Sequence, residues 1–259
     1  MELNKIYNMD CLIGMKQIES ESVDLILSDL PYGTTAQRWD KHIDMTLLWQ
    51  EYERIIKPNG NIVLTASQPF TTMLIHSNLP LFKYTWVWEK NSPTGFISAN
   101  HRPLKRHEDI VVFSKGVTSA GNNNVKAIYH PQGLKKAGIL KRNGKNRGKY
   151  IHEGKIGKNG HLNSNTTYVQ KYTNYPQSIL RFKRDMNTFH PTQKPVALFE
   201  YLVKTYSNEG GLVVDSCIGS GTTAIACINA HRHFIGFELN DTYFKQANER
   251  IKQHVKSNT

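Results

Sequence analysis

The sequence predicts an α/β fold in which helices cover both faces of a mostly parallel sheet, with one basic segment inserted. Stretches of strand length alternate with stretches of helical spacing over residues 1–114 and again over 179–259. The segment between them, 115–178, shows neither period and is rich in glycine and lysine. A chain of 259 residues, 39% of them hydrophobic, is long enough for one large domain with a smaller appendage.

Local patterns justify each element of the first 114 residues. The run at 23–27 is apolar and of strand length, and it stops at a polar Ser-Asp pair. Residues 45–57 have helical spacing and end at Pro58-Asn59-Gly60, a turn that a helix cannot pass. β-Branched and aromatic residues mark the later strands. The expected strands are 6–7, 23–27, 61–65, 83–89 and 109–113, and the expected helices are 11–18, 45–57 and 69–76.

Alternation resumes near residue 179, after the inserted segment. Pro195 opens a helix that reaches Tyr206, since proline is favoured in the first helical turn. The remaining expected elements are a buried strand at 212–215, a glycine loop, a helix at 222–230, a strand at 234–238 and a helix at 243–254.

Composition excludes several classes of protein. No run of about 18 apolar residues is present, so a spanning helix is not expected. The first five residues lack the apolar core of a signal peptide. Three cysteines, Cys11, Cys217 and Cys227, have no paired or zinc-binding spacing. We expect a soluble cytoplasmic protein without a bound metal and without a membrane partner.

The net charge of +12 is concentrated in one stretch of the chain. Residues 115–184 hold 15 lysines and arginines against a single acid, Glu153, for a local net charge of +14. The other 189 residues have a net charge of −2. A near-neutral body with a basic insert suggests a catalytic core joined to a polyanion-binding part. A solvated basic loop is the alternative.

A glycine loop follows the predicted strand at 212–215. Gly219 and Gly221 precede a helix, where backbone N–H groups favour an anion and glycine permits close approach of a ligand. Glu238 ends the next strand, and its carboxylate can accept hydrogen bonds from both ribose hydroxyls. These features predict a nucleoside-containing cofactor. The pattern also fits a dinucleotide such as NAD, or a tight structural turn.

A second candidate motif, Asp29-Leu30-Pro31-Tyr32, follows the buried strand at 23–27. In open α/β sheets, ligands bind at this carboxyl edge. The Asp29 carboxylate and a backbone carbonyl beside Pro31 can each accept one N–H of an exocyclic amine, and Tyr32 offers a ring face for base stacking. Two acceptors localise the lone pair of the amine and make its nitrogen more nucleophilic. A turn with an exposed aspartate is the alternative.

Taken in order, these motifs resemble the amino-group DNA methyltransferases that use S-adenosylmethionine. The resemblance rests on Asn8-Met9-Asp10-Cys11, the Asp29 tetrapeptide, His190-Pro191-Thr192-Gln193-Lys194-Pro195 and the Asp215 to Gly221 loop. Because the catalytic motif precedes the cofactor motif, the chain resembles the circularly permuted β class. The resemblance covers about 1–114 and 179–250 and implies a Rossmann-like methyltransferase fold in a bacterial or phage-encoded protein.

The resemblance also implies roles for individual residues. Asp29, Pro31 and Tyr32 would take the target base. Thr222 and Thr223 would hold the methionine carboxylate of the cofactor, and Lys194 with its neighbours would close the pocket. The implied cofactor-binding residues are Asp10, Cys11, Asp29, Lys194, Pro195, Asp215, Gly219, Gly221, Thr222, Thr223 and Glu238. Family members usually have proline where Leu30 stands, which puts the rigidity of this turn in doubt.

The family places its DNA-recognition region where the basic segment lies. We therefore expect a catalytic domain at 1–114 and 179–259 and an inserted target-recognition region at 115–178. Its expected backbone contacts are Lys141, Arg142, Lys145, Arg147 and Lys149. The target base must leave the duplex to react.

Asp29 at the head of the tetrapeptide favours adenine N6 as the methylated position by family association. Cytosine N4 is the alternative, and a nicotinamide-dependent oxidoreductase or a non-catalytic DNA-binding protein are more distant ones. The sequence leaves open whether the chain forms a homodimer or works with a cognate restriction endonuclease.

Overall fold

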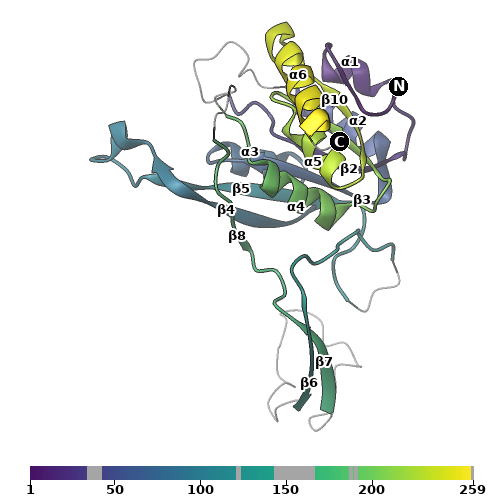
Figure 1. Cartoon of the computed structure of the whole chain (residues 1–259), viewed down its shortest axis with the longest axis vertical. Coiled ribbons are helices and arrows are strands. Elements are labelled where there is room, and N and C mark those ends of the chain that lie inside the picture. The colour runs from purple at the N-terminus through teal and green to yellow at the C-terminus, as the bar shows by residue number, and fades with distance from the viewer. Residues whose placement is uncertain (34–42, 121–123, 143–166, 187–188, 190–191, 258–259) are drawn as a thin grey trace. The chain divides into compact units, whose positions relative to one another are not determined.

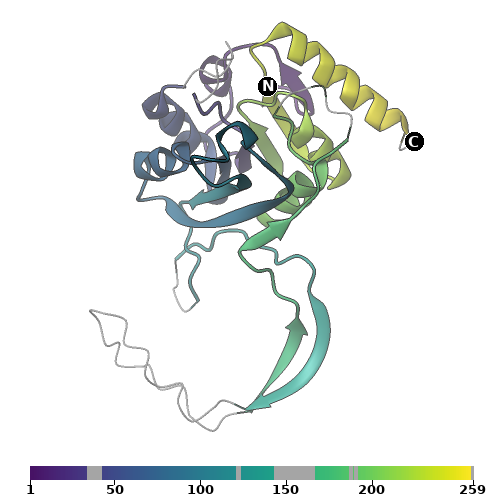
Figure 2. The ribbon, with the colours of Figure 1, turned by 90° about the vertical axis from the view of Figure 1, so that its left-hand side faces the viewer.

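The computed structural model describes residues 1–33, 43–120, 124–142, 167–186, 189 and 192–257. Contacts divide the chain into two compact units, one formed by residues 1–130 and 177–259 and the other by 131–176. The first unit holds an eight-stranded sheet with helices, and the second holds a two-stranded sheet (Figures 1 and 2).

The large sheet is mostly parallel, as predicted. Its strands lie in the order β1 (Lys5–Tyr7), β10 (His233–Phe237), β9 (Leu212–Asp215), β2 (Val23–Ser28), β3 (Ile56–Ala66), β5 (Lys105–Ser114), β4 (Phe82–Thr94) and β8 (Ile179–Arg181). Five neighbouring pairs are parallel, and β5 runs antiparallel to both β3 and β4. The pair β4–β5 therefore forms a long hairpin at one side of the sheet.

Helices cover both faces of this sheet because its strands are apolar on both sides. On β2, Leu25 and Leu27 point into one buried cluster, and Ile26 points into the other. One face carries α1 (Cys11–Met15), α2 (Met45–Ile55) and α3 (Phe70–Ser77), and the other carries α4 (Val196–Tyr206), α5 (Thr222–Asn229) and α6 (Asp241–Ser257) (Figure 2). Among the described residues, no helix has the length and apolar character needed to cross a bilayer.

Two local predictions were wrong. Helix α1 ends at Met15 rather than residue 18; the chain continues in turns in which the Ile18 N–H donates to the Met15 carbonyl, and the Arg54 guanidinium donates to the carbonyl oxygens of Met15 at 2.7 Å and Ile18 at 2.8 Å. The turn expected at 58–60 lies inside β3, which begins directly after α2. The register with β2 shifts there, since Val23 pairs with Ile56 but Leu25 pairs with Asn61, so the extra residues form a bulge.

The second unit contains β6 (Lys135–Arg142) antiparallel to β7 (Thr167–Thr173). It begins at 131, later than the residue 115 expected for the insert. Residues just before it are bonded to the first unit: the Ile128 N–H donates to Asn59 at 2.9 Å and the His130 N–H donates to Thr205 at 2.8 Å. Ile128 and His130 thus belong to the larger unit by these contacts, although the sequence analysis places them in the insert.

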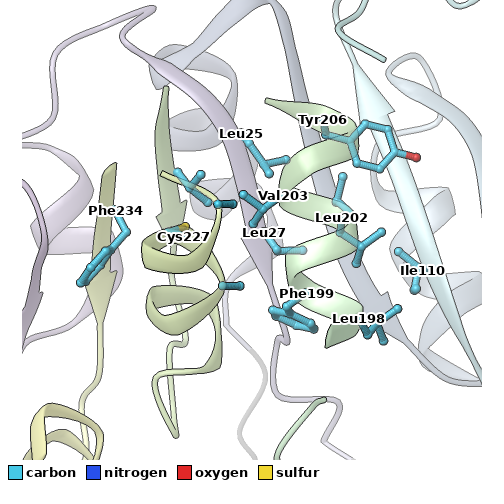
Figure 3. Packing of buried hydrophobic residues seen from close by; sticks show 14 of the residues in the cluster. Leu25, Leu27, Ile110, Leu198, Phe199, Leu202, Val203, Tyr206, Cys227 and Phe234 are labelled. Atoms are coloured by element: carbon cyan, nitrogen blue, oxygen red, sulfur yellow. The ribbon is translucent and has the colours of Figure 1, made fainter. Parts of the chain in front are cut away.

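Helix α4 packs its apolar side onto β2 and β5, as Figure 3 shows for Leu198, Phe199 and Leu202. Tyr206 ends this helix, and its side chain is completely buried. The Trp86 indole N–H donates to the Tyr206 hydroxyl at 2.5 Å, and the Tyr84 hydroxyl lies 3.1 Å away. A buried indole N–H needs such an acceptor.

Tyr206→Phe is expected to lower the free energy of unfolding by about 1–3 kcal/mol, because it leaves the Trp86 N–H buried without a partner. Urea denaturation measures the change. Tyr129→Phe is the control, since Tyr129 is 42% exposed, and it should shift the midpoint little. Equal midpoints for Tyr206→Phe and the unmodified protein would contradict the assigned bond.

Candidate active site

The two predicted motifs meet because β2 and β9 are neighbours. Leu25 pairs with Val213 and Ile26 with Val214. From this pair the sheet continues to β3 on one side and to β10 on the other, so the connections diverge between β2 and β9. Such a point opens a crevice at the carboxyl ends of the strands. The Asp29 tetrapeptide and the glycine loop follow these two ends.

A cleft of about 760 Å³ occupies this position. A volume of this order suits a drug-sized ligand. The predicted site residues that line it are Asp10, Cys11, Asp29, Pro31, Tyr32, Lys194, Asp215, Gly219, Thr222, Thr223 and Glu238. Two predicted residues lie elsewhere. Pro195 is buried at the beginning of α4, and Gly221 packs toward Ala247 of α6 with a φ of +77°.

Asp29 is held by three donors. The Tyr32 hydroxyl donates to its Oδ1 at 2.8 Å, and the Thr65 hydroxyl donates to the same oxygen. The Lys194 ammonium donates to Oδ2 at 2.6 Å. These bonds fix the carboxylate on the cleft wall, where it is only 21% exposed.

A row of alternating charges continues behind Asp29. Lys194 also lies 3.4 Å from Glu108, and Glu108 forms a second ion pair with Lys90. Burial raises the pKa of Glu108, but the ammonium groups of Lys194 and Lys90 outweigh it and lower the pKa to about 2. Burial lowers the pKa of Lys194, and the Asp29 and Glu108 carboxylates more than compensate. Glu108 and Lys194 therefore stay charged near pH 7.

Tyr32 presents an aromatic ring beside this carboxylate. The ring stacks on Phe70 with centroids 5.1 Å apart, and the Lys194 ammonium lies 5.8 Å from its centroid. Burial and the negative charge of Asp29 raise the pKa of Tyr32 well above its ordinary value. Tyr32 is therefore a neutral hydroxyl donor that orients Asp29.

The glycine loop and Glu238 also line the cleft. Glu238 accepts from the backbone N–H of Gly219 at 3.0 Å and of Asn240 at 2.8 Å. Each carboxylate oxygen retains a further acceptor position. Gly219 has a φ of +50°, a conformation that side-chain-bearing residues rarely adopt. The loop thus needs glycine at this position, and Glu238 can still accept hydroxyl groups of a ligand.

Asp215 ties the two strand ends together. Its Oδ1 accepts from the Ser28 hydroxyl at 2.6 Å and from the Cys217 N–H at 3.0 Å, and its Oδ2 accepts from the Thr223 hydroxyl. Burial raises the pKa of Asp215 to about 6. The carboxylate accordingly serves as a structural acceptor at the cleft floor.

The threonine hydroxyls are engaged within the protein. Thr223 donates to Asp215, and Thr222 donates to the Lys194 carbonyl at 3.3 Å while accepting from Arg250 at 3.1 Å. A carboxylate held here would therefore meet the backbone N–H groups of the first turn of α5.

Asp10 and Cys11 both line the cleft. The Asp10 carboxylate caps α1 by accepting from the Leu12 N–H at 2.7 Å. Cys11 lies against Cys217, and this contact together with burial raises the pKa of the Cys217 thiol. Leu30, the departure from the family pattern, is buried in the core cluster beneath α2 and α3. Apolar packing thus anchors the tetrapeptide at that position.

The sequence analysis missed several residues of the site. Thr65, at the end of β3, and Glu108, on β5, reach Asp29 or Lys194 through strand pairing that no local pattern encodes. A charged run at 105–109 directly before an apolar run was the available signal for Glu108.

In the second unit, Lys141 is exposed on β6 and Arg142 ends that strand. Lys145, Arg147, Lys149, His190 and Pro191 lie outside the described residues. Within the described ranges, no cluster of His, Cys, Asp and Glu suits a metal ion.

The sequence profile of a family described as DNA methylase, of the N6/N4 methyltransferase type, matches residues 23–249. The chain belongs to this family. The predicted resemblance to amino-group DNA methyltransferases is therefore confirmed, and the nicotinamide oxidoreductase alternative is wrong. The family depends on S-adenosylmethionine, which confirms the predicted cofactor.

Individual proteins similar to this DNA methylase agree with the assignment. Type II methyltransferase M1.MboII of Moraxella bovis is 28% identical, with 98% of each chain covered. DNA adenine methyltransferase YhdJ of Escherichia coli K12 is also 28% identical, over 96% of this chain and 83% of its own.

Solved structures support the methyltransferase fold. A complex of M1.HpyAVI with S-adenosylmethionine has a TM-score of 0.61 at 24% identity, covering 95% of this chain and 98% of its own. The cytosine-N4-specific PvuII DNA methyltransferase has a TM-score of 0.65 at 15% identity, covering 95% of this chain and 85% of its own.

Glu108→Gln is expected to lower the free energy of unfolding of the methylase by about 3–5 kcal/mol at pH 7, because two buried ammonium groups lose a counter-charge. The folded pKa of about 2 lies below the ordinary 4.5, so the carboxylate contributes fully above pH 4.5. The contribution is lost as the pH falls toward 2, and the two proteins should converge there.

Urea denaturation at pH 7 and pH 3 measures this difference. Glu209→Gln is the matched control, because Glu209 is 79% exposed and lies 4.0 Å from Arg232. It should change stability by less than about 0.5 kcal/mol. The charge row would be contradicted if Glu108→Gln lowered the free energy of unfolding as little as Glu209→Gln does. A loss of stability that grows at low pH would contradict it as well.

Proposed function

We propose that this DNA methyltransferase transfers the methyl group of S-adenosylmethionine to N6 of adenine in duplex DNA. The observation that carries the proposal is that Asp29 and Tyr32 line the same cleft as the glycine loop and Glu238. A base-binding motif and a nucleoside-binding motif thus share a single cavity.

The residues present fit the cofactor. Glu238 keeps acceptor positions for ribose hydroxyls, and the backbone at Gly219 is open to close approach. The first turn of α5 offers N–H groups to a carboxylate. Asp10, Cys11 and Lys194 complete the wall, and Asp215 holds the loop in place. When bound, the cofactor supplies an activated methyl group on a sulfonium.

Asp29 provides the acceptor for the amine of the target base. Its Oδ1 is filled by two hydroxyl donors, whereas Oδ2 holds Lys194 and retains one acceptor position. An amine N–H placed there leaves the nitrogen lone pair available for attack. Asp29 stabilises the positive charge that develops on the nitrogen and accepts the departing proton. Tyr32 supports the base by stacking.

Adenine is the first candidate because the tetrapeptide begins with an aspartate, Asp29, and in this family a leading aspartate is associated with adenine as the methylated base. The chemistry of the two amines is alike, and the similar proteins include both an adenine and a cytosine-N4 enzyme. Cytosine N4 is the second candidate.

Duplex DNA contacts are proposed for the inserted region, with Lys141 and Arg142 on β6 among the cations that meet phosphates. The relatives named Type II methyltransferases support a restriction-modification setting with a cognate endonuclease.

Asp29→Asn is expected to lower the methylation rate by about 10²–10⁴-fold, since the amide cannot accept the proton. Binding of DNA and of the cofactor should remain, measured by fluorescence anisotropy and calorimetry. Asp241→Asn, at an exposed position on α6, is the control and should retain full activity. Normal turnover by Asp29→Asn would refute the assigned role.

The methylated base is identified by digesting DNA from cells that express the chain and separating the nucleosides. N6-methyladenine is expected. N4-methylcytosine would replace the first candidate by the second. DNA binding by the unmodified protein without either product would favour the non-catalytic alternative.

Lys141→Ala is expected to weaken DNA binding for all sequences and to reduce the slope of log K against log salt by about 1. Titrations between low and physiological salt measure the slope. Lys245→Ala, on exposed α6, is the comparison and should leave it unchanged. A slope that Lys141→Ala does not alter would remove Lys141 from the phosphate contacts.

A further inference from the structure

The hairpin formed by β4 and β5 extends well past the cleft. Trp88 and Glu108 pair across the two strands and both line the cavity. From this pair β4 continues for six residues to Thr94, which pairs with Lys105. Six strand residues span roughly 20 Å. The hairpin ends in a short 3₁₀ turn, η1 (Phe96–Ser98), and Figure 1 shows the hairpin projecting beyond the rest of the sheet.

Two large apolar side chains stand at this tip. Phe96 is 67% exposed and Ile97 is completely exposed. Gly95, with a φ of +93°, turns the chain so that both follow directly in η1. Neither side chain belongs to the two buried clusters of the large unit. Adjacent apolar side chains at the end of a projecting hairpin indicate a surface that meets a partner.

The charge of the hairpin selects the class of partner. Residues 90–107 hold four lysines and arginines and no acid. Lys90 is buried against Glu108, and Arg106 lies 3.4 Å from Glu89. Arg102 and Lys105 remain exposed near the tip. A cationic rim around an apolar point complements a polyanion, whereas two copies that met tip to tip would bring like charges together.

We propose that the β4–β5 hairpin is a DNA wedge, in which Phe96 and Ile97 insert at the base step beside the target while Arg102 and Lys105 hold the neighbouring phosphates. The inference rests on the proposed base methylation, and it assigns the unstacking of the base to a segment outside the cleft. Apolar side chains are suited to this step because they replace stacking contacts that the flipped base gives up.

The test compares the double variant Phe96→Ser, Ile97→Ser with the control pair Met73→Ser, Leu79→Ser. The control residues are 57% and 60% exposed but lie on α3 and just after it. The recognised site is first located by sequencing modified bases in DNA from expressing cells. Single-turnover methylation is then measured on a matched duplex and on a duplex with a mismatch opposite the target base. Unfolding curves check that both variants remain folded.

The wedge predicts a loss on the order of 10- to 100-fold in the matched duplex for the tip variant and a rate near normal for the control. The mismatched duplex should restore the tip variant to within about threefold, because its target base is already unpaired. Fluorescence of 2-aminopurine at the target position should fall in parallel with the matched rate. Arg102→Ala with Lys105→Ala should instead weaken DNA binding and reduce its salt slope by about 2.

An unchanged rate for the tip variant, or a loss that the mismatch does not restore, overturns the wedge. The wedge is also overturned if light scattering shows that the tip variant changes from dimer to monomer while 2-aminopurine fluorescence shows normal base flipping. That result would assign the tip to contact between two copies of the chain. If the unmodified protein methylates neither duplex, the proposed function itself fails, which is distinct from failure of the wedge.

Discussion

The pairing of β2 with β9 is the constraint on which the active cleft depends. It brings the ends of two strands together from positions almost two hundred residues apart, and buried polar groups hold them there. Ser28 is central to this junction, since its hydroxyl donates to Asp215 at 2.6 Å and accepts from the Ser216 N–H at 2.8 Å. Asp215 then orders the glycine loop through Cys217 and Thr223. Such a fully bonded buried network favours one relative position of the two motifs.

A second layer of order comes from the charge row Asp29, Lys194, Glu108 and Lys90. Each charge has an opposite charge beside it, so the row as a whole adds no net charge to the cleft. Burying an unpaired ion is costly, and removing one member of the row leaves the neighbouring charges without an opposite charge. The row therefore keeps the Asp29 carboxylate paired and oriented before a substrate arrives, which is the preorganisation that polar catalysis requires.

Much of this arrangement could be predicted from sequence because its signals are local. The apolar run of β2, the glycine loop after β9 and the tetrapeptide at Asp29 each carry their own pattern, and parallel pairing brings them to the same edge. Glu108 and Thr65 could not be found in this way, since their place in the site is set by the register between antiparallel β5 and β3. The turns that follow α1 are bonded to Arg54, which lies on a different helix. The ribbon of β6 and β7 has mostly exposed side chains, so no apolar period marks it.

Lys194 connects the two halves of the cleft with one residue. Its ammonium binds the Asp29 carboxylate, and its carbonyl accepts from the Thr222 hydroxyl in the first turn of α5. A displacement of Lys194 at one of these contacts is therefore transmitted to the other. Replacing Lys194 will consequently disturb both contacts at once. Only double-mutant cycles with Asp29 and with Thr222 can separate the energy of one contact from that of the other.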